Sequence, residues 1–141
     1  MKILIMGLPT TGKTTLATEL RSRLNAIHFN ADEIRANIWT DLTFSEEDRL
    51  IHATRMGKLC DIATSQGFNV IADFVCPTEQ ARINFGSSII IWMNRTTSTS
   101  YVNTDNIFQV PAVYDLQITD GMTVEEEVVA VLDKLITLNV Y

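Results

Sequence analysis

The sequence predicts a single α/β domain built on a parallel sheet, and two observations lead to that prediction. Short apolar runs alternate along the chain with longer segments in which apolar residues recur every three or four positions. Strands that are separated by helices pair in parallel through right-handed crossovers. The 141 residues, 46% hydrophobic and 20% charged, have the size and composition of one globular domain, so 1–141 is expected to fold as one unit.

Five segments are expected to be strands. The first, Lys2–Met6, is a continuous apolar run that ends at Gly7, which is typical of a strand buried on both faces. The others are 26–29, 69–74, 88–93 and 115–118.

Helices are expected between these strands. The first is Lys13–Leu24, in which leucines recur every fourth residue, and the second is 32–39. A third begins after the N-cap residue Ser45 and ends at Gly67. The last begins after Thr123, which forms a capping box with Glu126 and precedes an apolar stripe.

The polar stretch 94–114 shows neither the helix nor the strand period. It is rich in Thr, Ser and Asn, and its length predicts a functional loop or lid.

Charge and composition exclude several classes of function. The net charge of −6 and the acidic pI of about 4.8 argue against a protein that coats nucleic acid, but they leave room for a small anion in a local pocket. Two cysteines, Cys60 and Cys76, are too few for a disulfide framework or a zinc site. No apolar run reaches the roughly 18 residues of a membrane span, and no cleavage signal follows the N-terminal apolar run. A cytoplasmic protein is therefore expected.

The segment directly after the first strand fits the phosphate-binding pattern G-x-x-x-x-G-K-[ST] in full. The expected ATP-binding residues here are Gly7, Leu8, Pro9, Thr10, Thr11, Gly12, Lys13, Thr14 and Thr15. The glycines allow the backbone N–H groups to surround phosphate oxygens, Lys13 adds positive charge, and Thr14 is expected to bind Mg²⁺. The motif predicts a three-layer P-loop NTPase-type domain, with helices flanking strands in the order 2-3-1-4-5.

A phosphate site alone does not name a reaction. GTPases usually need a longer chain and an N-K-x-D segment, which this sequence lacks. The short chain and its late polar loop favour a kinase of a small molecule, in which a lid covers the phosphates.

The segments after the P-loop resemble those of adenylylsulfate kinases, in order and over nearly the whole chain. Residues 29–35 (FNADEIR) resemble the family's D-G-D-x-x-R, and 44–49 (FSEEDR) resemble F-S-x-x-D-R. Residues 67–77 (GFNVIADFVCP) are similar in spacing to G-x-x-V-I-x-A-F-I-S-P, and 115–126 resemble the closing strand and helix.

This resemblance implies transfer of the γ-phosphate of MgATP to the 3′-hydroxyl of adenylylsulfate. It implies that Asp32 is the general base or a metal-organising carboxylate, and that Arg35 and Arg49 hold the phosphosulfate. Phe44 would stack on the adenine of the acceptor, with Tyr101 on its opposite face. By the same resemblance Phe74 would line the acceptor site and Arg95 would lie near the adenine or phosphates of ATP.

The sequence departs from the family pattern at several positions. Asn30 replaces the first aspartate of D-G-D, and His52 replaces an asparagine. Asp73 stands where the family has alanine, and is expected to contact Mg²⁺ through water. Between Met93 and Pro111 the only basic residue is Arg95.

Two alternatives stay open beside the adenylylsulfate kinase reading. The chain could phosphorylate another small acceptor, such as a nucleoside, nucleotide, sugar or antibiotic, or it could bind a nucleotide with little turnover. The expected partners are small nucleotides, without nucleic acid or membrane, and a homodimer is left open. His28, Trp39 and Trp92 are interpreted as packing residues, and Cys76 is given no role.

Overall fold

All five predicted strands form, and they pair in parallel in one sheet with the predicted order β2-β3-β1-β4-β5. The computed structural model describes residues 1–97 and 107–141. The strands are β1 (Lys2–Met6), β2 (Ala26–Asn30), β3 (Asn69–Asp73), β4 (Ile89–Met93) and β5 (Leu116–Ile118). The helices are α1 (Lys13–Leu24), α2 (Ala31–Asn37), α3 (Glu46–Ser65), α4 (Glu79–Phe85) and α6 (Val124–Thr137).

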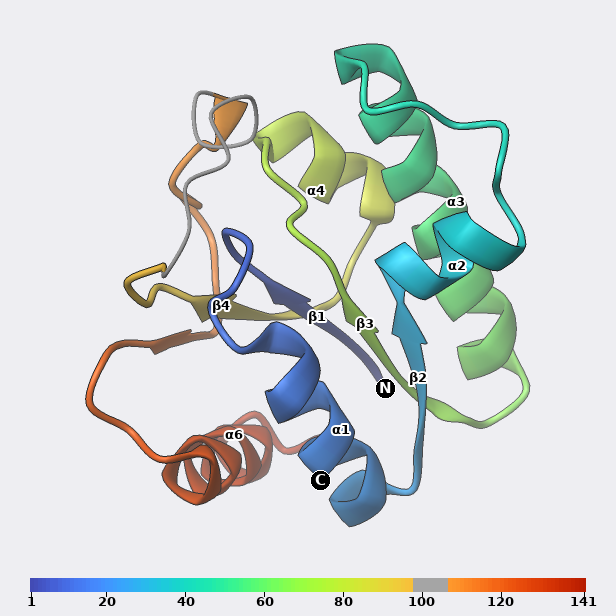
Figure 1. Ribbon diagram of the computed structural model, residues 1–141. Coiled ribbons are helices and arrows are strands. Elements are labelled where there is room, and N and C mark those ends of the chain that lie inside the picture. Colours follow the sequence, from blue (N-terminus) through green and yellow to red (C-terminus); the bar gives the residue numbers. More distant parts are fainter. Residues whose placement is uncertain (98–106) are drawn as a thin grey trace.

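Helices cover both faces of the sheet, so the domain has three layers (Figure 1). The alternating side chains of β1 explain this arrangement, because successive residues of a strand point to opposite faces. Ile3 and Ile5 pack in a cluster with the apolar faces of α1 and α6. Leu4 and Met6 pack in a second cluster with residues of α2, α3 and α4. The central strand is thus buried on both faces, as its continuous apolar run predicted.

The structure corrects the sequence prediction in two places. It contains a helix, α4, in a stretch where none was expected, and Thr78 caps its first turn by accepting a hydrogen bond from the Ala81 N–H. It also extends β2 to Asn30 and starts α2 at once, because the Asn30 side chain accepts a hydrogen bond from the Glu33 N–H at 2.9 Å. Asn30 is therefore the N-cap of α2, and the helix begins one residue earlier than expected.

The last part of the stretch 94–114 is fixed to α4. Arg82 is buried and donates hydrogen bonds to the carbonyl oxygens of Cys76, Pro77 and Gln109. Its partner Glu79 accepts a further hydrogen bond from the Ala112 N–H. Tyr101 lies outside the described residues.

None of the helices in the described parts of the chain is both long and apolar enough to cross a membrane.

The carboxyl ends of β1, β2, β3 and β4 meet at one edge of the sheet. The P-loop leaves β1 there, β2 ends at Asn30 and β3 ends at Asp73. Asn30 and Asp73 are register partners on neighbouring strands. Open α/β sheets bind their ligands at this edge, so the fold itself brings the predicted site residues together.

Helices α3 and α4 approach each other closely at Gly57, and a substitution there tests this packing. A Cβ atom at this position would lie 2.1 Å from the backbone oxygen of Phe85, closer than any real contact. In an ordinary helix a change from glycine to alanine stabilises by about 1 kcal/mol. Here we expect Gly57→Ala to destabilise the protein by at least about 1–3 kcal/mol, since backbone must move. Denaturant unfolding measures this, with the exposed neighbour change Lys58→Ala as control; unchanged or increased stability would contradict the packing.

His52 gives a pH-dependent prediction. The ring is 3% exposed, and burial lowers its pKa from 6.5 to about 4, with help from the charges of Arg35 and Arg55. Because the unfolded chain binds the proton more readily, stability falls as the pH drops from about 6.5 towards 4. Relative to His52→Phe, the wild-type protein should lose about 2 kcal/mol of unfolding free energy between pH 7 and pH 5. Parallel losses in the two proteins would show that His52 does not titrate in this way.

Candidate active site

The P-loop is shaped by close contact with the end of β4. Gly7 has a φ of +147°, and a Cβ atom there would lie 2.6 Å from the carbonyl oxygen of Met93. No residue with a side chain fits without a shift of the backbone, which explains the first glycine of the motif. Within the loop, the Thr11 hydroxyl donates to the Leu8 carbonyl at 2.8 Å.

The N-terminus of α1 is left open for an anion. Its N-cap residue, Gly12, has no side chain to occupy the first N–H groups, and no acidic residue lies in the first turn. Every other helix described above has at least one acidic residue in its first turn. Since a helix N-terminus carries partial positive charge, α1 can place that charge on a phosphate group.

Lys13 lies under the loop and is almost completely buried. Its ammonium donates to the Leu8 carbonyl at 2.7 Å. Burial lowers the pKa of Lys13 from 10.5 to about 8, and the charges of Asp73 and Asp32 oppose this shift. A phosphate next to the ammonium would favour its charged form further.

Asp73 is the centre of a buried hydrogen-bond network at the end of β3. It is 2% exposed, and its Oδ1 atom accepts from the Thr14 hydroxyl at 3.0 Å and from the Asn30 amide at 3.1 Å. Its Oδ2 atom is hydrogen-bonded to the His28 ring and lies 3.3 Å from the Asn30 amide. The interpretation of His28 as a packing residue was therefore wrong.

The donor set around Thr14 fits a magnesium ion that is held mainly by the nucleotide. Among residues 1–97 and 107–141, no cluster of three His, Cys, Asp or Glu side chains is arranged to hold a metal. Mg²⁺ bound to nucleotide phosphates usually needs only one or two protein ligands and keeps several waters. The exposed hydroxyl of Thr14, with Asp73 behind it, supplies such a position.

On the α2–α3 side, two arginines flank an exposed aromatic ring. Phe44 is 68% exposed, and the guanidinium carbons of Arg35 and Arg49 lie 4.5 and 5.7 Å from its ring centroid. Arg35 donates to the Thr43 carbonyl and Arg49 to the Phe44 carbonyl, both at 3.0 Å. Burial, followed by the charge of Arg49, lowers the pKa of Arg35. Two like charges held together in this way favour an anionic ligand.

One cavity of about 970 Å³ joins the P-loop to these arginines. The site residues predicted from the sequence that line it are Pro9, Thr10, Gly12, Lys13, Thr14, Thr15, Asp32, Arg35, Phe44, Arg49, Asp73 and Phe74. Single-ligand pockets typically measure about 300–1,000 Å³, so the volume of this cavity lies at the upper end of that range. Three other residues of the predicted ATP site, Gly7, Leu8 and Thr11, do not line the cavity.

The inner wall of the cavity includes His52, between the edges of Trp39 and Phe74. Neither ring nitrogen has a hydrogen-bond partner among the described residues. The low pKa keeps the ring neutral at physiological pH, with one donor and one acceptor.

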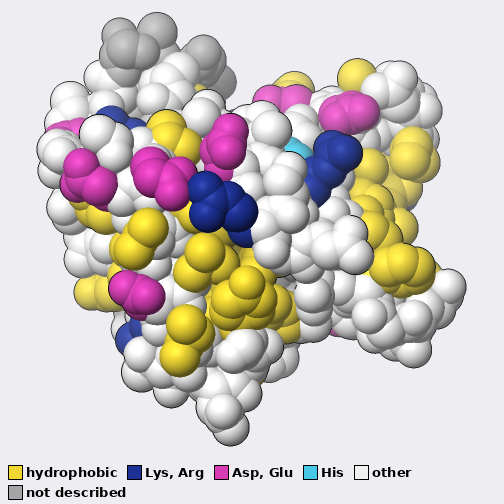
Figure 2. All heavy atoms as spheres, turned by 90° about the horizontal axis from the view of Figure 1, so that it is seen from below, with side chains coloured by type: hydrophobic (Ala, Val, Ile, Leu, Met, Phe, Trp, Pro, Cys, Tyr) yellow, Lys and Arg dark blue, Asp and Glu magenta, His cyan; other side chains and the backbone are white. Residues whose placement is uncertain are grey.

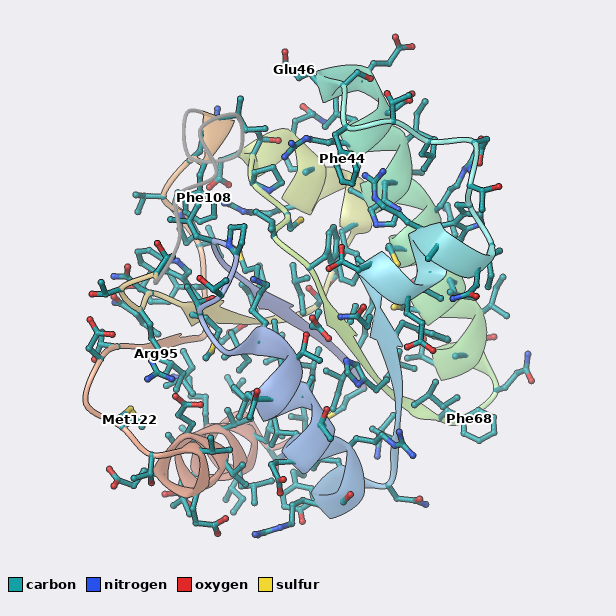
Figure 3. All side chains as sticks on the ribbon, viewed as in Figure 1. Phe44, Glu46, Phe68, Arg95, Phe108 and Met122 are labelled. Carbon is teal, nitrogen blue, oxygen red and sulfur yellow. The ribbon has the colours of Figure 1, made fainter. Side chains whose placement is uncertain are left out.

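Arg95 does not line this cavity. Figure 3 shows Phe44 on the segment that leads into α3 and Arg95 on the other side of α1, near α6. Its guanidinium forms an ion pair with the buried carboxylate of Glu127 at 2.9 Å. One of its nitrogens also lies 3.4 Å from the position of a Cβ atom on Gly12, so Arg95 flanks the P-loop from outside.

Sequence reasoning missed His28 and the role of Asn30. The alternation of side chains along β2 places His28 and Asn30 on the same face of the strand, two residues apart. That pattern indicates that the two polar side chains can contact the same group. The group is Asp73 on β3, and it is identified only by the pairing of β2 with β3.

Surface charge is mixed. On the face that Figure 2 shows, Lys and Arg side chains lie at separate places among acidic and hydrophobic ones, and no continuous basic strip crosses that face.

Comparison with known proteins identifies the family. The model of the family described as adenylylsulphate kinase matches residues 1–105. An adenylyl-sulfate kinase of Vibrio cholerae is 33% identical over 81 residues, which are 54% of this chain and 38% of that protein. One of Paraburkholderia xenovorans is 29% identical and the match covers 96% of this chain and 93% of the relative.

A solved structure has the same fold. The APS kinase of Mycobacterium tuberculosis in complex with AMPPNP and APS (adenylylsulfate) superimposes with a TM-score of 0.86 at 19% identity, over 95% of this chain and 96% of that one. The chain spans about two-fifths of the length of the first curated relatives that it matches, 38% and 40%. With the family model matching 105 of its 141 residues, the chain belongs to the adenylylsulfate kinase family.

Proposed function

We propose that this protein transfers the γ-phosphoryl group of MgATP to the 3′-hydroxyl of adenylylsulfate. The proposal rests on the cavity, which has a phosphate-binding loop at one end and an exposed aromatic ring close to two arginines at the other. The names of the relatives support the choice of substrates. The homodimer and the cytoplasmic location stay predictions.

The chemistry of the acceptor matches the α2–α3 side of the cavity. Adenylylsulfate has a flat base and an anionic phosphosulfate. Phe44 offers an open ring face on which a base can stack, which is worth about 1–3 kcal/mol in comparable sites. Arg35 and Arg49, whose guanidinium carbons lie 4.5 and 5.7 Å from the centroid of that ring, can hold the anion by charge-assisted hydrogen bonds.

The reaction itself needs positioning and charge more than covalent chemistry. The 3′-oxygen of the acceptor forms a bond to the γ-phosphorus, and the bond to the β–γ bridging oxygen breaks, which releases ADP. Asp32, exposed on the cavity wall one turn from Arg35, accepts the proton of the hydroxyl. Lys13 and the N-terminus of α1 stabilise the charge that develops on the phosphate oxygens.

Mg²⁺ completes this site in the proposal. Thr14 would hold it directly, and Asp73 or Asp32 would reach it through water. When bound, the ion neutralises part of the charge on the β- and γ-phosphates.

The direct test measures ATP turnover with and without adenylylsulfate. A coupled assay detects the ADP that is released, and mass spectrometry identifies the product. Adenylylsulfate should stimulate ADP release and gain one phosphate. Lys13→Ala and Asp32→Ala should abolish this turnover, since loss of a general base alone typically costs about 10²–10⁴-fold.

Three results would overturn parts of the proposal. Full activity in either variant would remove the role given to that residue. Turnover with another acceptor from a panel of nucleosides, sugars and antibiotics would replace the substrate. Tight ATP binding without turnover on any acceptor would show a nucleotide-binding protein instead of a kinase.

Phe44 gives a prediction specific to the acceptor. Phe44→Ala should raise the KM for adenylylsulfate about tenfold or more, because a stacking contact is lost, and leave the KM for ATP unchanged. Phe68→Ala is a matched control, since Phe68 is also exposed, at 49%, and Figure 3 shows it at the far end of α3, away from the cavity. A Phe44 variant that behaves like the Phe68 variant would contradict the stacking role.

A further inference from the structure

We infer that His28 is a positioning residue, which fixes the carboxylate of Asp73 so that the Thr14 hydroxyl is presented to the metal of the bound nucleotide. The inference rests on the proposed MgATP site and not on the identity of the acceptor. No part of the family resemblance assigns a role to this histidine.

The carboxylate of Asp73 is fully engaged in hydrogen bonds within the protein. Both carboxylate oxygens are occupied by donors from the protein, with Thr14 and Asn30 on Oδ1 and His28 on Oδ2. With only 2% of the residue exposed, little of this carboxylate is open to the cavity. Asp73 therefore acts on a metal through Thr14 or through a water, and its own orientation decides where the Thr14 hydrogen points.

Two contacts set the direction in which Thr14 is held. Its hydroxyl gives its hydrogen to Asp73 at 3.0 Å, and it also accepts from the Asn30 amide at 3.2 Å. A hydroxyl that donates inward keeps oxygen lone-pair density for the cavity side, where Thr14 is exposed. Partners behind a metal ligand typically change metal affinity by about 10–100-fold when they are removed.

His28 and Asn30 contact Asp73 differently. The Asn30 amide reaches both oxygens of Asp73, at 3.1 and 3.3 Å, while its own oxygen caps α2. Because the amide is near both oxygens, Asn30 alone does not fix the orientation of the Asp73 carboxylate about its Cβ–Cγ bond. Thr14 contacts Oδ1 only, and His28, from a side chain that is 10% exposed, contacts Oδ2 only, so His28 holds the oxygen that Thr14 does not reach. Because a carboxylate accepts, the Nε2 atom that faces it carries the hydrogen.

The test compares His28→Gln with His28→Leu. Glutamine keeps an N–H donor at similar reach, whereas leucine keeps an apolar volume without a donor. The measurement is the affinity for ATP by calorimetry, with Mg²⁺ and with EDTA. Mg²⁺ should increase the affinity for ATP about tenfold less in His28→Leu than in the wild type. In His28→Gln most of this increase should remain. Affinity for ATP in EDTA should match the wild type in both variants.

Each other outcome overturns the inference. An unchanged Mg²⁺ enhancement in His28→Leu would show that the ring only packs. Equal losses in the two variants, or a loss of affinity in EDTA as well, would show a general disturbance of the loop, and thermal unfolding would reveal it if it extends to the fold. No acceptor is present in this experiment, so failure of the proposed acceptor would not affect its result.

Discussion

Asp73 places a carboxylate almost completely out of solvent at the end of a central strand, and a buried charge of this kind must be met by donors from the elements around it. The donors come from β2, through His28 and Asn30, and from the first turn of α1, through Thr14. The same contacts connect the phosphate loop to the neighbouring strand. Removing the carboxylate would therefore change the orientation of the loop hydroxyl as well as the local charge.

The two ends of the cavity carry different cationic groups. At one end, α1 begins without an acidic residue and Lys13 lies buried, so positive charge is available for phosphate oxygens. At the other end, Arg35 and Arg49 are held by backbone carbonyls around the exposed Phe44 ring. These separate cationic groups give a protein with a net charge of −6 two local positions that favour anions. Arg95 forms an ion pair with Glu127 and does not line this cavity.

Features that depend on local sequence could be predicted, and the P-loop motif led to the correct strand order as well. Individual side-chain contacts between neighbouring strands could not be predicted. The strand and helix on either side of the P-loop, the burial of β1 and the N-caps Ser45 and Thr123 depend on neighbouring residues, and the structure confirms each. Helix α4 was missed, although α2 has the same length of seven residues and was expected. The buried face of α4 includes the charged Arg82 beside Ala81 and Phe85, so its sequence lacks a clear apolar stripe. His28 was read as a packing residue because its partner is on another strand, and only the β2–β3 register brings the two together. The acceptor residues were predicted through family resemblance, and the geometry adds that they share one cavity with the P-loop.

In the proposed site, the carboxylate of Asp73 organises the magnesium of a bound nucleotide through Thr14. The most direct measurement is the affinity of Asp73→Asn for ATP, titrated with and without Mg²⁺. Asparagine keeps the size of the side chain but lacks the negative charge and has only one acceptor oxygen. We expect the variant to bind ATP in EDTA at least as tightly as the wild type, because a negative charge near the phosphates is gone. The gain in affinity from Mg²⁺ should be lost. A variant that keeps the full gain from Mg²⁺ would contradict this role of Asp73.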